Sequence, residues 1–379
     1  MQLELNEQQK MIKNMVREFA EKEVGPIASE LDKKKEYPTK TLEKMAKLGL
    51  LGIIIPTEYG GAGLDTISYA TVVEEISRKC ASTGVVTSVH NSLTAWPIIK
   101  YGTDGQKKKY LPILAKGEKI GAFAGTEPNA GSDLGAMKTT AVLKGNKYII
   151  NGDKTFITSG PKAGIIIVFA VTDKNAGAKG ISAFIVENTF RGFKVGSIFE
   201  KLGINASLTS ELIFENMEVP KENLLGKEGD GFKIALSTLD GGRIGIAAQA
   251  VGIAQAALDE SIEYSKQRQQ FGRPIAQFQA IQWMIADMAT RIEAARYLVF
   301  NAAFKKDKGE RISKEAAMAK LFASDTAMDA VIKAVQIHGG YGYTKEYTVE
   351  RLFRDAKITE IYEGTSEVQR MVIAGSLLR

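Results

Sequence analysis

The sequence predicts an α+β multi-domain protein: an N-terminal helical domain, a central antiparallel β-domain and a C-terminal four-helix bundle. Three observations lead to this prediction. Apolar residues recur at helical spacing up to about residue 120. Short alternating segments rich in β-branched residues follow, up to about Gly226. Long Ala-rich segments with helical spacing return from Gly231. We therefore expect domains at residues 1–120, 121–228 and 229–379.

Composition bounds the class of protein. A chain of 379 residues exceeds what one hydrophobic core usually fills, which also favours two or three domains. No apolar run reaches transmembrane length, so we expect no membrane insertion. Cys80 is the only cysteine, which excludes an intrachain disulfide and favours a reducing compartment. Residues 1–7 have neither a basic nor an apolar leader region, and we expect a soluble, cytoplasmic protein.

Several kinds of chemistry are excluded. The net charge of +6 is spread over lysine-rich faces such as residues 33–35 and 107–109, without interleaved aromatics, so we expect no nucleic-acid partner. His90 and His338 are far apart and lack metal-ligand spacing, so we expect no metal site. The chain has no Gly-x-Ser-x-Gly elbow, no Walker-type loop and no Rossmann fingerprint. Any dinucleotide must bind outside a Rossmann crevice.

The first third of the chain reads as helices. Asn6 and Gln9 form a predicted capping box for a first helix, which we expect to end near Gly25-Pro26. A second helix should begin after Pro38-Thr39 and stop at Gly49. The glycine cluster at residues 60–63 lacks a preceding strand and reads as a loop. Further helices are expected at about 67–79, 88–101 and 104–115.

The pattern changes at Gly121. Gly145-Asn146 between two alternating runs is a hairpin signal. Because no helical crossover separates the runs, they should form an antiparallel sheet or small barrel. The expected strands are 139–143, 148–151, 165–171, 181–186 and 208–214.

The last third returns to long helices. Apolar residues share one face of segments 243–268 and 279–305, and Ser313 should cap a third helix that ends at Gly339-Gly340. A fourth helix is expected at 366–378. Together these four predict an antiparallel bundle. Its remaining apolar stripes favour burial by oligomerisation.

Glu363 is the candidate catalytic residue. It lies at a Gly-Thr break between two helical runs, beside Ile361 and Tyr362. Partial desolvation there would raise the pKa of its carboxyl group towards the range of a general base. On this segment alone the alternative, a surface carboxylate near a helix start, is favoured because structural carboxylates outnumber catalytic ones.

Four further segments change that balance. They are FAGTEPNAGSD at 123–133, FIT at 156–158, LDGGRIG at 239–245 with RQQFG at 268–272 and Gln279, and QIHGGYG at 336–342. With the helical, β, helical order, they resemble the acyl-CoA dehydrogenase family of flavoproteins, especially its short-chain (butyryl-CoA) branch, over essentially the whole chain. The segment YEGT at 362–365 then resembles the family's catalytic-base segment. Phe156 stands where many relatives have Trp. The phenyl ring would preserve the apolar wall behind the flavin that the resemblance implies.

The resemblance implies a role for each matched residue, with FAD as cofactor and Glu363 as the catalytic base. The flavin side of FAD would contact the β-domain segments, and its diphosphate and adenosine would contact the later ones, partly across a subunit interface. The implied FAD contacts are Phe123, Thr126, Ser132, Phe156, Thr158, Arg268, Gln270, Phe271, Gln279, Gln336, Gly339, Gly340, Thr365 and Glu367. The implied acyl-CoA contacts are Ser132, Asp240, Arg243, Tyr362 and Gly364.

The implied reaction is α,β-dehydrogenation of an acyl-CoA to the trans-2-enoyl-CoA. Glu363 would take the α-proton while hydride leaves the β-carbon for flavin N5. The Glu363 backbone N–H and the ribityl 2′-hydroxyl of FAD would stabilise the enolate. Electrons would pass to electron-transferring flavoprotein. The resemblance and the apolar bundle also imply a homotetramer, arranged as a dimer of dimers.

Two positions indicate which branch of the acyl-CoA dehydrogenase family the chain resembles. Isovaleryl and long-chain relatives carry their base at the position of Gly242, so Glu363 has no rival there. Glutaryl-CoA dehydrogenases carry an arginine at the position of Gly84, and segment 82–88 here has no cation. A short, uncharged acyl chain is expected. The alternatives are an acyl-CoA oxidase, a component of an electron-bifurcating complex, a dehydrogenase for another short branched or cyclic acyl-CoA, and a non-enzymatic helical scaffold.

Overall fold

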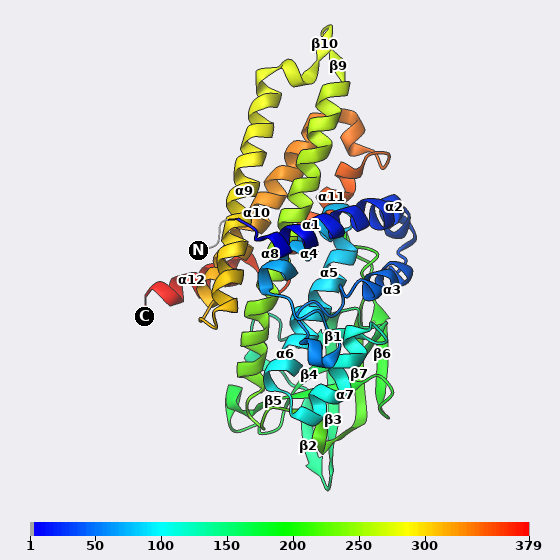
Figure 1. The fold of residues 1–379 in the computed structure, drawn as a ribbon. Coiled ribbons are helices and arrows are strands. Elements are labelled where there is room, and N and C mark those ends of the chain that lie inside the picture. Colours follow the sequence, from blue (N-terminus) through cyan, green and yellow to red (C-terminus); the bar gives the residue numbers. More distant parts are fainter. Residues whose placement is uncertain (1–3, 379) are drawn as a thin grey trace.

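The computed structural model describes residues 4–378. Residues 1–3, which open the segment expected to lack a leader, and residue 379 lie outside this range. Helices, a β-domain and helices again follow one another along the chain, in the order expected from the sequence (Figure 1). The β-domain lies at one end of the molecule, and the hairpin of the two longest helices extends to the other. Helix α8 (Gly231–Gln267), one of these two helices, begins beside the β-domain, and the site is built along it.

The N-terminal part is almost entirely helical. Its helices are α1 (Glu7–Phe19), α2 (Gly25–Lys34), α3 (Thr39–Lys47), α4 (Thr66–Lys79), α5 (Ala81–Ser88), α6 (Trp96–Tyr101) and α7 (Asp104–Ala115). The predicted capping box is present, because the Asn6 side chain accepts from Gln9 N and the Gln9 side chain accepts from Asn6 N, both at 2.9 Å. The glycines at 60–63 form a loop, as expected.

Two predicted boundaries in this part are wrong. The first helix does not end at Gly25-Pro26, because a π-helical turn over Ala20–Val24 carries it directly into α2. Pro26 then sits in the first turn of α2, where a missing N–H costs no hydrogen bond. The helix expected at 88–101 begins instead at Ala81, with a π-helical stretch over Val89–Ala95. Its first residues, rich in Ser, Thr, Val and Gly, are all buried, so tertiary packing overrides their weak helix propensity.

The β-domain contains eight strands in the described residues. They are β1 (Ile120–Ala124), β2 (Thr140–Lys144), β3 (Lys147–Thr158), β4 (Ala163–Val171), β5 (Ile181–Glu187), β6 (Phe193–Ile198), β7 (Thr209–Pro220) and β8 (Leu224–Leu225). The predicted hairpin at Gly145-Asn146 joins β2 to β3. β1, β6 and β8 were not expected from the sequence.

The sheet is mixed rather than wholly antiparallel. Its order is β6-β7-β3-β2-β4-β5-β8, and β1 pairs with β4 in parallel, as does the end of β2. The other strand pairs of this sheet are antiparallel, as predicted. One face of β4 packs on β3, β5 and β7, and the other packs on α6 and α7. Burial on both faces explains why β4 reads as a continuous apolar run.

The C-terminal part is built on three long helices, α8 (Gly231–Gln267), α9 (Gln279–Asp307) and α10 (Ser313–His338), followed by α11 (Thr348–Lys357) and α12 (Ser366–Leu377). A short ribbon of β9 (Gln269–Gln270) and β10 (Arg273–Pro274) closes the tip of the α8–α9 hairpin (Figure 1). The sequence predicted α12 as the fourth bundle helix. It packs on α10, whereas α11, which was not expected, packs on both α8 and α10.

Ser313 does not cap α10 as expected. No side-chain cap is present at that end, and the Ser313 hydroxyl instead donates to Asp240 Oδ2 at 2.6 Å. The predicted end of the helix is present, because Gly339 follows with φ +61°.

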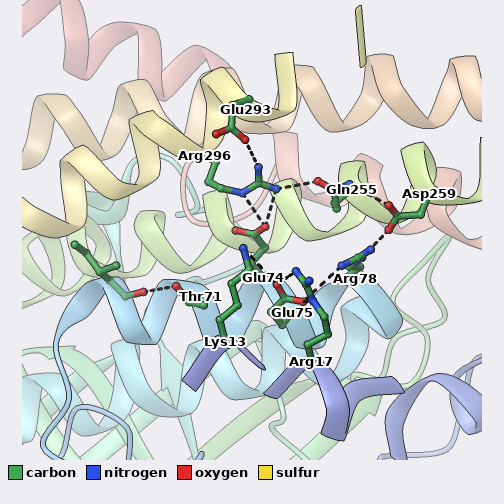
Figure 2. A network of polar contacts seen from close by, with 11 residues as sticks. Lys13, Arg17, Thr71, Glu74, Glu75, Arg78, Gln255, Asp259, Glu293 and Arg296 are labelled. Carbon is green, nitrogen blue, oxygen red and sulfur yellow. Dashed lines mark hydrogen bonds and ion pairs between the residues drawn. The ribbon is translucent and has the colours of Figure 1, made fainter. Parts of the chain in front are cut away.

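A buried ionic network fixes α4 against α8 and α9 (Figure 2). Glu74 on α4 accepts from Arg296 of α9 at 2.8 Å, and Glu75 accepts from Arg17 of α1 at 2.8 Å. Arg78 pairs with Asp259 of α8 at 2.6 Å. Helices α4 and α8 approach so closely that a Cβ on Gly252 of α8 would lie 2.4 Å from the Glu74 carbonyl oxygen. This contact sets the position of α4 beside the central part of α8.

Candidate active site

Glu363 lies in a tight turn that directs its side chain at α8. The turn precedes α12, whose first residues are capped by Thr365 through a 3.3 Å bond from Val368 N. Glu363 and Gly364 both have positive φ, +53° and +94°. A Cβ built on Gly242 would lie 2.1 Å from Glu363 Oε2, so the carboxylate fills the space that any side chain at position 242 would need. The two positions expected to carry a base therefore face the same point.

The carboxylate of Glu363 is poorly solvated. Both of its oxygens are buried and have no hydrogen-bond partner within the described range 4–378. Burial raises the pKa of Glu363 to about 8, although the charges of Lys320 and Arg243 act in the opposite direction. Leu93 supplies an apolar wall, since its Cδ2 would lie 2.7 Å from a Cβ on Gly242. Ile361, which the sequence placed in that role, is exposed instead.

Arg243 and Asp240 form a buried pair one turn apart on α8. Arg243 Nη1 donates to Asp240 Oδ1 at 2.8 Å. Burial raises the pKa of Asp240 and lowers that of Arg243. Arg243 Nε has no partner among the described residues. The positive charge of Arg243 also acts on the nearby Glu363 carboxylate and lowers its pKa.

Two phenols lie near Glu363. The Tyr362 hydroxyl donates to the side chain of Gln249 on α8, which in turn donates to the Ala81 carbonyl at 2.8 Å. Tyr69 on α4 shares a 2.8 Å hydrogen bond with Ser88. A Cβ on Gly245 would lie 2.1 Å from the Tyr69 hydroxyl oxygen, so α8 is open to these side chains only because it carries glycine there.

The β-domain brings its two predicted segments together. Thr155 N donates to the Thr126 carbonyl at 2.9 Å, so residues 123–133 lie against the end of β3. Buried Lys154 donates to Glu127 Oε1 at 2.8 Å and ties the same two segments by side chains. Phe123 and Thr158 are partly buried, and Ser132 is exposed.

Phe156 sits at an irregularity in β3. The β3–β7 register shifts between Lys154 and Ile157, and Phe156 has φ +58°. This bulge turns the ring outward, where it is 63 % exposed and packs on Phe199 at 4.8 Å between centroids. An exposed aromatic face at this point is available to a planar ligand.

A second group of predicted residues gathers at the far end of α8. Arg268, Gln270, Gly339 and Gly340 line a cavity of about 470 Å³. Phe271 beside it is 92 % exposed, and Gln279 and Gln336 are exposed at nearby helix ends. Gly242 and Arg268 are separated along α8 by about 39 Å at 1.5 Å per residue. Within one chain, this second group therefore cannot line the same site as Glu363.

Thr365 and Glu367 lie at the start of α12, beside the base rather than beside the distant cavity. Glu367 is exposed in the first turn of that helix. The structure thus divides the predicted cofactor residues into three places. These are the end of β3, the start of α12 and the tip of the α8–α9 hairpin.

Sequence reasoning missed four polar groups near the predicted residues: Lys320, Gln249, Gln369 and the Glu127–Lys154 pair. Lys320 is the most informative, because it is a single lysine on the apolar, Ala-rich face of α10 and is 0 % exposed. A charged residue at such a position was the available signal. No group of acidic, histidine and cysteine side chains among residues 4–378 could hold a metal ion. The same range contains no helix long and apolar enough to span a membrane.

Comparisons with known proteins match the whole architecture. The N-terminal, middle and C-terminal domain models of acyl-CoA dehydrogenases match residues 6–118, 122–217 and 229–378. The chain is 56 % identical to the short-chain specific acyl-CoA dehydrogenase of Clostridium acetobutylicum, with both chains fully covered.

Solved structures agree. Butyryl-CoA dehydrogenase from Megasphaera elsdenii superposes with a TM-score of 0.98 at 49 % identity, covering 100 % of both chains. A chain from a structure of the electron-transferring flavoprotein of Acidaminococcus fermentans, described in terms of flavin-based electron bifurcation, has a TM-score of 0.99 at 57 % identity, again over both full chains.

Proposed function

Because the chain belongs to the acyl-CoA dehydrogenase family of FAD-dependent oxidoreductases, we propose that it oxidises a short-chain acyl-CoA, such as butyryl-CoA, to the trans-2-enoyl-CoA. The observation that carries this proposal is the buried Glu363 carboxylate, unpartnered in the described structure and facing Gly242. A thioester α-proton is too weakly acidic for an ordinary exposed carboxylate. A carboxylate with a raised pKa is a better match for it.

The residues present fit the FAD that the family uses. Exposed Phe156 offers an apolar face beside Thr126 and Thr158. At the other end of α8, the guanidinium of Arg268 beside the Gly339-Gly340 backbone suits a diphosphate, since a planar fork can donate two parallel hydrogen bonds. Further contacts there would come from Gln270, Phe271, Gln279 and Gln336, with Phe123, Ser132, Thr365 and Glu367 on the flavin side. These residues would hold FAD, which when bound would supply the hydride acceptor for the β-hydrogen.

This chain's own residues then have four tasks. Glu363 takes the α-proton at a carboxylate oxygen. Its backbone N–H would donate to the thioester oxygen, where charge develops as that proton leaves. Leu93 and the packed face of α8 exclude water from the base. Ser132, Asp240, Arg243, Tyr362 and Gly364 would border the acyl-CoA.

Two features favour a short, uncharged acyl group. A Cβ on Gly84 would lie 2.0 Å from Ser77 Oγ, so no arginine for a distal carboxylate fits at that position. Gln249 lies two turns along α8 from Gly242, on the same face, and is buried in its bond with Tyr362. This closed polar contact would bound the space beyond the base.

We expect butyryl-CoA to be oxidised with a higher kcat/KM than longer chains. Each further methylene gains only about 0.8 kcal/mol by burial, so neighbouring lengths should be accepted with lower efficiency. Anaerobic bleaching of the yellow flavin across a panel of acyl-CoAs measures this. A higher efficiency with palmitoyl-CoA than with butyryl-CoA would exclude the short-chain assignment, and a colourless protein would favour the helical scaffold.

We also expect a homotetramer, a dimer of dimers, because the FAD residues at the tip of the α8–α9 hairpin lie far along α8 from those at the end of β3 and the start of α12, and would meet them across subunits. Exposed Trp283 on α9, Ile332 on α10 and Met371 on α12 supply apolar surface for this contact. Light scattering should give four times the chain mass of 41.2 kDa.

A variant pair sharpens that test. Trp283→Glu, at a side chain 64 % exposed, should reduce the mass and release FAD, whereas Val142→Glu, at a β-hairpin side chain 53 % exposed, should do neither. A one-chain mass with FAD still bound would contradict the shared site.

The electron acceptor in this proposal is an electron-transferring flavoprotein, in the cytoplasm. A second candidate keeps the same site but runs within an electron-bifurcating complex. The likeness to the A. fermentans structure favours it. Co-purification of a flavoprotein partner that couples NADH oxidation to the site would distinguish the two.

The proposed domain boundaries remain residues 1–120, 121–228 and 229–379.

A further inference from the structure

Lys320 is a buried cation directly behind the turn that carries Glu363. Its side chain is fully buried among the small residues of α10, and no carboxylate within residues 4–378 forms an ion pair with it. Its ammonium group donates to the Gly364 carbonyl at 2.8 Å. An unpaired buried ammonium is costly, so a position of this kind needs a compensating interaction. Burial lowers the pKa of Lys320 to about 8, and the negative charge of Glu363 is the strongest influence in the opposite direction.

The turn itself requires support. Glu363 has a left-handed φ of +53°, which disfavours a residue with a side chain, and Gly364 follows at +94°. Gln369 Nε2 donates to the Gly364 carbonyl at 2.7 Å and to the Glu363 carbonyl at 3.3 Å. Lys320 and Gln369 therefore both donate to the carbonyl oxygen of Gly364, the residue that follows the base.

We infer that Lys320 is a positioning residue for the base. Its ammonium group holds the Gly364 carbonyl so that the Glu363 carboxylate is aimed at Gly242, and its positive charge favours the ionised form of that carboxylate. The assignment of a base rests on the proposed function. Lys320 does not contact the substrate in this scheme, and it acts only through the turn and the charge of Glu363.

The charged and titratable groups around Glu363 come from several elements. Arg243 of α8 is the second cation that acts on it, and it is already paired with Asp240. Tyr69 of α4 and Tyr362 of the same turn are neutral phenols whose pKa values the carboxylate raises further. Glu360 and Asp325 act on Lys320 rather than on Glu363. Lys320 is thus the one cation acting on Glu363 that has no ion-pair partner in the described chain.

Infrared titration tests this inference without any substrate. The carbonyl band of the protonated Glu363 carboxyl group is assigned by its loss in Glu363→Gln. In the parent holoenzyme it should disappear as pH rises through about 8. In Lys320→Met and Lys320→Gln, the midpoint should move up, because Lys320, with its own pKa lowered by burial to about 8, is still charged on the acid side of the titration, and a nearby opposite charge favours the ionised carboxylate.

The matched control is Lys333→Met, on the same helix. Lys333 pairs with Asp329 at 2.9 Å and lies away from the turn, so its removal should leave the midpoint at the parent value. Parent-like midpoints in both Lys320 variants would overturn the inference. If Lys320→Met fails to fold, Lys320→Gln, which retains a donor for the carbonyl, decides the same question.

Flavin reduction separates charge from positioning. At a pH where Glu363 is ionised in every variant, Lys320→Met should reduce flavin about tenfold more slowly with butyryl-CoA, because a small misplacement of a catalytic group is costly. Lys320→Gln should recover most of that loss. Equal rates in all three proteins would overturn the positioning role.

Failure of the proposed function gives a different pattern. The parent would then not bleach with any acyl-CoA, while the infrared midpoints would still shift.

Discussion

Replacing Glu363 with Gly should abolish flavin reduction, and adding Gly242→Glu should restore part of it. This is the expected result if the two positions reach the same substrate proton. A Cβ on residue 242 would lie 2.1 Å from the position now occupied by Glu363 Oε2, so a side chain brought from α8 enters the volume that the first substitution vacates. Glycine also fits the +53° φ at position 363, so the turn should persist.

The rescue should be partial. Leu93 Cδ2 lies 2.7 Å from the new Cβ position and must move, and a glutamate at 242 starts closer to the reacting point than the native one does. We expect the double variant to reduce flavin about tenfold or more faster than Glu363→Gly, while remaining below the parent, since a positioned base contributes about 10²–10⁴-fold.

Anaerobic stopped-flow with butyryl-CoA measures these rates, and Gly242→Ala serves as the matched control. A methyl group there collides with the native carboxylate without supplying a new one, so that variant should lose activity. If the double variant stays as inactive as Glu363→Gly while still binding FAD and acyl-CoA, the claimed equivalence of position 242 is wrong.

The parts of the fold that the sequence predicted are those with short-range signals. The capping box of Asn6 and Gln9 and the hairpin at Gly145-Asn146 involve residues within a few positions of each other. Gly25-Pro26 is also a short-range signal, yet it fails. The π-turn before it supplies Gly25 N with the Ala20 carbonyl, so the helix passes through with its bonds satisfied. Whether the helix continues through Gly25-Pro26 therefore depends on packing and not on the dipeptide.

The site shows the same division. Glu363 and its relation to Gly242 could be inferred from the resemblance, because both lie in recognisable segments. Lys320 could be noticed as a lone charge on an apolar helix face, but its contact with Gly364 could not be inferred, since the two meet only once α10 has packed beside the last turn. Adjacency assigned the apolar surroundings to Ile361 and Tyr362, but Ile361 is exposed, and Leu93 from the N-terminal domain supplies an apolar wall. Contacts between segments distant in sequence have no local signature.

Glu363→Gln should slow flavin reduction by orders of magnitude while leaving binding intact. The amide keeps the size of the carboxylate and fits the same buried space against α8. It cannot accept the α-proton, and it removes the negative charge beside Lys320 and Arg243. A positioned general base contributes about 10²–10⁴-fold, and its loss from a desolvated site should reach at least that range. The FAD residues at the end of β3 and at the tip of the α8–α9 hairpin are untouched, so the variant should remain yellow.

The role of Glu363 as the base is tested most directly by the rate of anaerobic flavin bleaching with butyryl-CoA, compared between the parent and Glu363→Gln. Titration of the FAD spectrum with a CoA thioester, done in parallel, verifies that both proteins bind ligand. If Glu363 is the base, the parent should bleach rapidly, and the variant should bleach about 10²-fold or more slowly at equal occupancy. Bleaching of the Glu363→Gln flavin as fast as that of the parent would show that another group takes the α-proton.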